Sequence, residues 1–323
     1  MNELIDFMPG IDLPVGEVSE KLSKMWEENR DNPLSGFRAS QMNLVLHFGR
    51  NVKSEDAKSR FNIALKFAQK YPSRIIVLCP FLKKIEAMRA KLFSQCYIGK
   101  SHREMCCCEA LFLGYSSEDN GFLHNQVSVW LESDLPIYHW FSEVRKDRVM
   151  KYFPNLLKRV NKIVYDSNVE SDAFIGIKWP FSNKVVDLAR ARLLPVKQAI
   201  GQYLSSYSVD LLTNELESIK IYHSNLNRGD ANHLGEWLQS TLKSEKISSL
   251  NLTNIELNFD SEKEIGFKVM YKDGRFIEWY KNRNKSLSNL RHTIEGINVE
   301  LAIKTKPMAP EQELSEAFYF ASI

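Results

Sequence analysis

The chain has 323 residues, of which 44% are hydrophobic and 26% are charged. This length normally gives about two domains, and the hydrophobic fraction is that of a globular protein. The 43 basic and 40 acidic residues leave a net charge of only +3, which argues against a dedicated nucleic-acid-binding protein because such proteins carry a strong basic excess. No apolar run is long enough to span a bilayer, and the acidic N-terminus is too short in apolar residues for a signal peptide. We therefore expect a cytoplasmic protein that binds neither nucleic acid nor membrane.

The first half of the chain alternates between strand and helix patterns. Apolar residues at helical spacing predict helices around 18–26 and 57–68, with a strand over 43–48 between them. The run 74–79 is apolar and rich in β-branched residues, which is typical of a buried strand in a central sheet. Further elements are predicted as strands over 105–113, 135–141 and 162–165 and as a helix over about 147–160. The alternation predicts an N-terminal α/β sheet domain over residues 1–168.

A polar stretch at 166–172 interrupts this alternation and is taken as the domain boundary. Behind Pro195, which suits a first helical turn, an apolar stripe predicts a helix as far as residue 204. The remaining patterns predict helices over 231–242 and 311–320 and strands over 219–222, 250–259, 265–271, 275–280 and 297–304. An Asp-Gly pair at 273–274 indicates a tight hairpin turn. The second domain, residues 169–323, is therefore expected to be α+β with a largely antiparallel sheet.

The five cysteines include one consecutive run, Cys106, Cys107 and Cys108. There is no Cys-x-x-Cys, so the usual spacing of zinc ligands and of thioredoxin-type motifs is missing. On one strand Cys106 and Cys108 share a face and Cys107 takes the other, so the three cannot readily surround one metal ion. We interpret the run as small apolar residues of a buried strand and favour this over a redox switch.

The recognised signatures of catalytic and cofactor sites are missing from the sequence. Phosphate and dinucleotide loops need closely spaced glycines, yet the 14 glycines include no Gly-x-Gly and no Walker loop. There is no His-Glu-x-x-His and no Gly-x-Ser-x-Gly motif. His223 and His233 could converge at a strand end, although two satisfied surface histidines are the simpler interpretation. We assign no catalytic residue, no metal ligand and no cofactor, and we predict that the chain is not an enzyme.

Two positions are candidates for a structural or interface role. Asp166 follows a predicted strand, where α/β sheets commonly place binding residues, but a capping or loop-forming aspartate is an equally good interpretation. Trp140 belongs to an aromatic cluster in which Tyr138 and Trp140 share one face of the strand and His139 and Phe141 the other. Rings on both faces favour a central strand packed on two sides. A protein-docking patch is the alternative, because Trp and Tyr are frequent interface anchors.

The segment 187–195 is predicted to hold the main polar constellation. Val185, Leu188 and Arg192 follow one another at spacings of three and four, so Arg192 falls on an apolar stripe if the segment is helical. A buried arginine needs a carboxylate, a carbonyl cluster or an anion, because breaking a buried ion pair costs about 3–5 kcal/mol.

Partners for this arginine can be proposed from the boundary stretch. Asp166 and Asp172 are the candidates, whereas Asp187 is expected to face Arg190 or Ala191 along its own helix. We favour an ion pair between the two domains over a contact with a ligand or a partner.

Five segments, in order along the chain, resemble one known family. Residues 42–46 are similar to a Leu-Asn-Leu-Val strand, and 71–78 to a His-Pro-Ser-Arg-x-Ile-Val-Leu segment. Residues 134–140 are similar to Pro-Asp-Leu-Pro-x-x-x-Trp, and 164–167 to a Val-x-Asp-Ser turn. The most specific piece, 187–195, resembles Asp-Leu-x-Trp-x-Arg-Leu-x-Pro. The family is that of the glucose-6-phosphate dehydrogenase assembly protein, OpcA.

The chain departs from this family at identifiable positions. Arg190 stands where the family typically has Trp, Val196 follows Pro195 where Trp is usual, and the C-terminal part is less similar. The resemblance implies a divergent, non-catalytic accessory subunit whose partner is glucose-6-phosphate dehydrogenase, the enzyme that opens the oxidative pentose phosphate pathway. A sugar-phosphate-binding enzyme or metabolite sensor, with Asp166 and a nearby arginine in a strand-end crevice, is the alternative.

Overall fold

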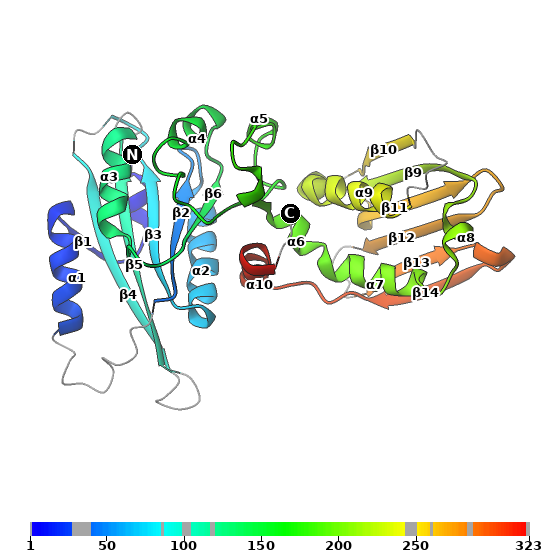
Figure 1. Ribbon diagram of the computed structural model, residues 1–323, viewed down its shortest axis with the longest axis horizontal. Helices are drawn as coiled ribbons and strands as arrows, with labels where there is room; N and C mark the ends of the chain where they lie inside the picture. Colours follow the sequence, from blue (N-terminus) through cyan, green and yellow to red (C-terminus); the bar gives the residue numbers. More distant parts are fainter. Residues whose placement is uncertain are drawn as a thin grey trace. The chain divides into compact units, whose positions relative to one another are not determined.

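The structure is a computed structural model that describes residues 2–27, 40–84, 87–98, 105–116, 120–242, 251–258, 261–282 and 287–320. The chain forms two compact units (Figure 1). Unit 1 consists of Met1–Tyr165, Glu170–Val186 and Pro310–Ile323, and unit 2 consists of Asp166–Val169 and Asp187–Ala309. The division therefore differs from the single boundary at 168/169 that the sequence suggested, because the chain passes between the units more than once.

Unit 1 is built on an eight-stranded sheet with the order β1-β4-β5-β3-β2-β6-β7-β8. The strands from β5 to β7 in this order are parallel, and β4 and β1 extend one edge in the antiparallel sense. The bounds are β1 (Ile11–Leu13), β2 (Met42–Phe48), β3 (Ser73–Pro80), β4 (Arg89–Ile98), β5 (Met105–Tyr115), β6 (Ile137–Ser142), β7 (Lys162–Tyr165) and β8 (Val185–Asp187).

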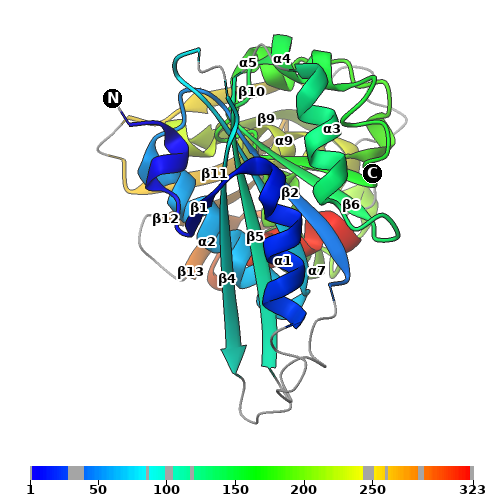
Figure 2. The same cartoon turned by 90° about the vertical axis from the view of Figure 1, so that its left-hand side faces the viewer.

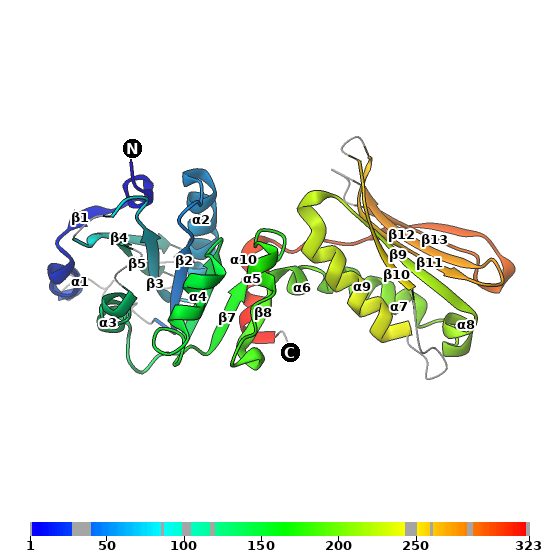
Figure 3. The ribbon, with the colours of Figure 1, turned by 90° about the horizontal axis from the view of Figure 1, so that it is seen from above.

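Helices cover both faces of this sheet, as a parallel sheet requires. Figure 2 shows α1 and α3 in front of the sheet and α2 behind it, and Figure 3 shows the same two layers from above. On the α2 side, Phe61 packs edge-on against Phe112 of β5, with ring centroids 5.0 Å apart. The helices of unit 1 are α1 (Val18–Glu27), α2 (Ser54–Lys70), α3 (Asn120–Trp130), α4 (Lys146–Tyr152), α5 (Asp172–Ile175) and α10 (Pro310–Ser315).

The strands predicted around 43–48, 74–79, 105–113, 135–141 and 162–165 are all present, so the α/β fold class is confirmed. The helix predicted over 147–160 is wrong in its second half, because α4 ends at Tyr152 and turns follow. Pro154 explains the early end: proline has no N–H to donate within a helix, and it disfavours helical geometry at the preceding residue.

The C-terminal segment belongs to unit 1. The predicted helix over 311–320 is α10, which continues into a π-helical turn at Glu316–Phe320. Phe318 packs on Phe67 of α2 and on Tyr138 of β6, at centroid distances of 5.6 and 4.7 Å. The ring centroid of Tyr319 lies 4.9 Å from that of Tyr71. These ring contacts attach the end of the described chain to the α2 face of the sheet.

Unit 2 is an α+β unit. Its six-stranded sheet has the order β10-β9-β11-β12-β13-β14, and every pairing is antiparallel except that of β10 with β9. The helices α7 and α9 lie along one face of the sheet (Figure 3). The strands are β9 (Leu216–His223), β10 (Asn251–Glu256), β11 (Lys263–Tyr271), β12 (Phe276–Asn282), β13 (Leu287–His292) and β14 (Val299–Lys304). The helices are α6 (Leu188–Arg192), α7 (Leu194–Leu204), α8 (Val209–Thr213) and α9 (Arg228–Leu242).

Candidate functional site

Most of the polar residues singled out in the sequence meet in unit 2, where the turn 166–169 lies against α6 and α9. Asp187 is the N-cap of α6, and its Oδ1 accepts hydrogen bonds from the backbone N–H groups of Ala189 and Ser167, both at 3.0 Å. A carboxylate is favourable at this position because it satisfies helix N–H groups that have no partner within the helix. The expectation that Asp187 faces Arg190 or Ala191 is therefore wrong: Asp187 caps the helix instead of lying along it.

Arg192, at the end of α6, joins two carboxylates. Its guanidinium donates to Oδ2 of Asp166 at 2.5 Å and to Oδ1 of Asp230 at 2.9 Å. The Asp230 side chain is 5% exposed, the Asp166 side chain 18% and the Arg192 side chain 27%. Burial raises the pKa of Asp230, whereas the charge of Arg192 lowers it. Arginine suits this position because its planar fork can serve two acceptors at once.

The turn 166–169 also anchors the start of α9. The side-chain oxygen of Asn168 accepts from the backbone N–H groups of Gly229 and Asp230, at 2.7 and 3.1 Å. Gly229 has room for no side chain, because a Cβ there would lie 1.9 Å from Oγ of Ser167. The backbone therefore approaches the turn closely enough for Asn168 to satisfy the first N–H groups of the helix.

His233, one helical turn along α9, completes the network. Its Nε2 lies 2.8 Å from Oδ2 of Asp187, and its Nδ1 lies 3.1 Å from Oε2 of Glu236. Burial alone would lower the pKa of His233, but the hydrogen bonds to Asp187 and Glu236 raise it to about 9. The ring is therefore protonated at neutral pH and donates from both nitrogens. A general base needs a free, neutral nitrogen near the operating pH. This Asp–His arrangement therefore suits a structural ion pair better than proton abstraction.

The other candidates have different surroundings. Asp172 begins α5 in unit 1. Arg190 is exposed on α6. Trp140 is 4% exposed in β6, so its ring is part of the core of unit 1 and is not available as a docking anchor.

Sequence reasoning missed Asp230 and undervalued His233. Both lie on α9, 38 and 46 residues away from their partners Arg192 and Asp187. The available signal was spacing: residues 230 and 233 are three apart and share one face of α9, which begins at Arg228, three residues before the predicted start at 231. The prediction of this helix used only its apolar residues and did not consider the polar residues on this face.

The cysteines give a mixed result. Cys108 is buried, as expected of a small core residue, and its Sγ lies 3.6 Å from the carbonyl oxygen of Gln95. Cys96 in β4 is disulfide-bonded, and the residue opposite it in β5 is Cys107. The side chains of Cys106 and Cys107 lie outside the described part of the structure. Among the described residues, no group of three or more His, Cys, Asp or Glu side chains could hold a metal ion.

None of the helices in the described ranges is long and apolar enough to cross a membrane.

Two comparisons with known proteins find similarity to the same family. Residues 64–176 match the family model described as the glucose-6-phosphate dehydrogenase subunit N-terminal domain. The chain is also similar to the putative OxPP cycle protein OpcA of Synechocystis sp. strain PCC 6803, with 25% identity over 192 residues. This match covers 58% of the present chain and 40% of the relative, so the chain corresponds to less than half of that protein.

Two solved structures show loose similarity. The first is the aldose-aldose oxidoreductase from Caulobacter crescentus complexed with glycerol, with 12% identity, a TM-score of 0.38 and coverage of 86% of this chain and 88% of that one. The second is the dipicolinate-bound dihydrodipicolinate reductase from Paenisporosarcina sp. TG-14, with 8% identity, a TM-score of 0.30 and coverage of 86% and 93%. These overlaps are too loose to establish a shared fold.

Proposed function

We propose that the chain, which is similar to the OpcA family, is a non-catalytic accessory protein that promotes the assembly or the activity of glucose-6-phosphate dehydrogenase. The match of residues 64–176 to the family model carries this proposal. The matched range lies in unit 1 except for the turn 166–169 and includes strands β3 to β7, so it corresponds to a folded part of the protein and not to an isolated motif.

The chemistry of the polar network supports an accessory role. Arg192 is bound by two carboxylates, and His233 is protonated and held between Asp187 and Glu236. Each of these charges already has an opposite charge within hydrogen-bond distance. The network therefore stabilises the fold around the start of α9 and offers no poised acid, base or nucleophile.

The proposal is tested with the purified chain and its cognate dehydrogenase. We expect the two proteins to co-migrate in size-exclusion chromatography at micromolar concentrations. We also expect titration of the chain into the dehydrogenase to raise kcat or lower KM for the sugar phosphate. The chain alone is expected to show no turnover with either nicotinamide cofactor.

Heat-unfolded chain at the same concentration is the control, because it has the same composition without the folded surface. The proposal fails if the native chain neither co-migrates with the dehydrogenase nor changes its kinetics more than the unfolded chain does. Turnover by the chain alone that is abolished by a point substitution in it would contradict the non-catalytic part.

A metabolite sensor remains the second candidate function. The crevice with Asp166 and a nearby arginine, which the sequence suggested for a sensor, does not support this function, because Asp166 and Arg192 bind each other. The observation in its favour is a different one, a pocket with several arginines in unit 1.

A further inference from the structure

The pocket lies at the carboxyl edge of the parallel sheet, where the chain changes direction. From β2 the chain leads through α2 to β3 on one side, whereas β6 lies on the other side of β2. The connections that follow β2 and β6 therefore diverge and leave a crevice between the two strand ends. Ligands of open α/β sheets bind preferentially at such a switch point.

The backbone at this point is held in a defined conformation. The N–H of Gly49, directly after β2, donates to the carbonyl oxygen of Ser142 at 2.7 Å, and a Cβ at Gly49 would lie 1.7 Å from the carbonyl oxygen of Glu143. Glu143 has a φ of 59°, a left-handed conformation that is uncommon for a residue with a side chain. Its N–H donates to Glu170 at 2.7 Å, and its carboxylate accepts from Arg60 at 2.8 Å. Such constrained backbone is frequent at functional sites.

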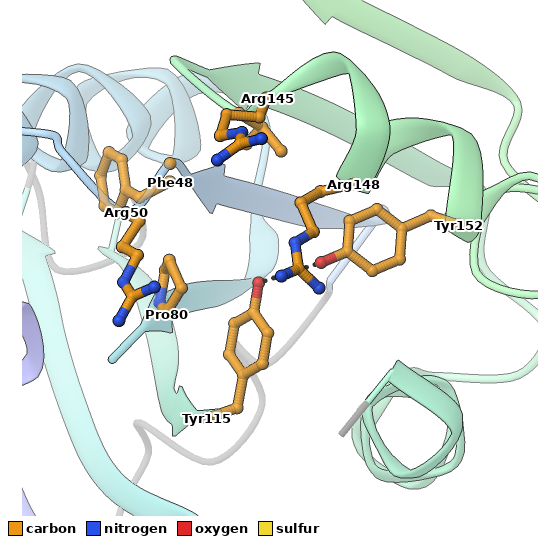
Figure 4. A pocket seen from close by; sticks show the side chains of 9 residues that line it. Phe48, Arg50, Pro80, Tyr115, Arg145, Arg148 and Tyr152 are labelled. Atoms are coloured by element: carbon orange, nitrogen blue, oxygen red, sulfur yellow. Dashed lines mark hydrogen bonds between the residues drawn. The ribbon is translucent and has the colours of Figure 1, made fainter. Parts of the chain in front are cut away.

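The pocket combines an apolar floor with a basic rim (Figure 4). It is a small, partly open cavity of about 50 Å³, and its lining includes Phe48, Pro80 and Val144. Arg50, Arg145 and Arg148 also line it, and no acidic residue does. Asp147, outside the lining, lies 3.0 Å from Arg145 and 3.9 Å from Arg148.

Arg50 is exposed and forms no ion pair with any residue that the structure describes. The lining therefore contributes three positive charges and no negative one, which favours an anionic ligand.

A chain of buried polar groups leads from the core to this pocket. Nε2 of His139 lies 3.1 Å from Nδ1 of His47, and Nε2 of His47 lies 2.7 Å from the hydroxyl of Tyr115. The Tyr115 hydroxyl lies 3.3 Å from that of Tyr152, beside Arg148 at the pocket (Figure 4). Both histidines are fully buried, and burial lowers the pKa of each, that of His47 to about 3. Each ring is therefore neutral and carries one N–H.

The hydrogen-bonding state of His139, at the inner end of this series, determines the direction in which the hydrogen bonds are donated. Nδ1 of His139 is buried and has no hydrogen-bond partner among the described residues. If donation ran inward, Nδ1 would carry a buried N–H without an acceptor, which is rare and costly in proteins. If donation runs outward, Nδ1 keeps only a lone pair. Then His139 donates to His47, His47 donates to Tyr115, and Tyr115 donates to Tyr152. The Tyr152 hydroxyl is then left to donate into the pocket.

From this geometry we propose that the pocket binds a small phosphate monoester. The phosphate accepts hydrogen bonds from the arginines and from the Tyr152 hydroxyl, and the carbon skeleton lies on the apolar floor. A phosphate monoester carries close to two negative charges at neutral pH and presents several acceptor oxygens, which matches the arginine donors and the Tyr152 hydroxyl of the site. The proposal goes beyond the accessory function and does not depend on it.

The test is isothermal titration calorimetry on the full chain alone, so a missing dehydrogenase interaction cannot affect it. The probes are glucose 6-phosphate, glucose and inorganic phosphate. For a small, open site we expect a dissociation constant on the order of 0.1–1 mM for glucose 6-phosphate, weaker binding of phosphate and none of glucose. No heat from either phosphate compound at ~10 mM, or equal binding of glucose, overturns the proposal. Binding of phosphate with exclusion of glucose 6-phosphate overturns the monoester assignment.

Three variants locate the binding. Arg50→Ala changes an exposed residue and should leave the melting temperature unchanged, yet weaken glucose 6-phosphate binding at least about fivefold. Tyr152→Phe keeps the ring and removes the terminal donor, and should weaken binding about tenfold. Arg190→Ala, which removes an exposed arginine in unit 2, is the matched control and should bind like the native chain. Unchanged affinity in both pocket variants, with native melting, would show that the anion binds elsewhere.

Discussion

Replacing Arg192 by alanine should destabilise unit 2, because two carboxylates depend on this cation. Without it, the Asp230 carboxylate, only 5% exposed, would be left with Asp166 and no opposite charge bridging them. Removing one member of a fully buried ion pair costs about 3–5 kcal/mol. The Arg192 side chain is 27% exposed, so water recovers part of this cost, and we expect a loss of about 2–4 kcal/mol in the free energy of unfolding.

Differential scanning calorimetry measures this loss, with Arg190→Ala as the matched control on the same helix. Arg190 is exposed, so its substitution should change stability by less than about 0.5 kcal/mol. For a unit of this size, the Arg192→Ala loss corresponds to a decrease of roughly 6–16 °C in the midpoint of the transition that unfolds unit 2. Equal melting of the two variants would refute the reasoning. Normal melting of Arg192→Ala together with lost activation of the dehydrogenase would instead place Arg192 in a partner contact.

The pH dependence gives a second check on the same prediction. Burial raises the pKa of Asp230 even with Arg192 present, and without the arginine this pKa should rise further. A carboxyl whose folded pKa exceeds its unfolded value binds its proton more tightly in the folded state. The destabilisation caused by the charged carboxylate is therefore complete above the folded pKa, and it disappears as pH falls towards the unfolded pKa of about 3.9. The stability difference between the native chain and Arg192→Ala should thus narrow from pH 7 to about pH 4.5. A constant difference would show that lost packing, and not lost charge, is responsible.

Two further predictions concern single residues. Because the pKa of His233 is raised to about 9, its stabilising contribution is complete below the unfolded pKa of about 6.5 and is lost as pH rises through about 9. His233→Gln should therefore lower stability most below pH 6.5 and very little near pH 10, as measured by denaturant titration; a pH-independent effect would contradict the ionic explanation. Gly49→Ala should strongly destabilise unit 1, because its Cβ would lie 1.7 Å from the carbonyl oxygen of Glu143. Gly16→Ala, where nothing lies within 4 Å of the added Cβ, is the control and should melt like the native chain.

The central strands of unit 1 could be predicted because their sequences are nearly continuous apolar runs. Strands β2 and β3 are buried over their whole length, and a parallel sheet covered on both faces requires such continuous apolar runs. Strand β4 was not predicted. Its segment Arg89–Ile98 mixes polar and apolar residues near the sheet edge, a pattern that is also typical of exposed loops.

The candidate site could be predicted only in part, because its pairs are distant in the chain. The sequence showed that Arg192 needs a carboxylate, and Asp166 is one of the two that it binds. Asp230 could not be assigned, since helical periodicity specifies which face of α9 a residue occupies but not which turn that face meets. For the same reason the helix at 311–320 was predicted as an element, whereas its packing in unit 1 was not.

Arg192 of unit 2 and the three arginines at the pocket of unit 1 have different surroundings, which indicates a structural role for the first and a binding role for the others. In unit 2 the guanidinium of Arg192 is shared by two carboxylates, and the pair is largely buried, so its charge is used within the fold. At the pocket of unit 1, Arg50, Arg145 and Arg148 line one space, and no acidic residue lines it with them. A fold gains little from gathering like charges at a concave surface, because their mutual repulsion is unfavourable. The cost is explained if an anion enters the pocket. We therefore expect an anionic ligand at the switch point of the sheet in unit 1. The charges at the start of α9 stabilise the fold of unit 2.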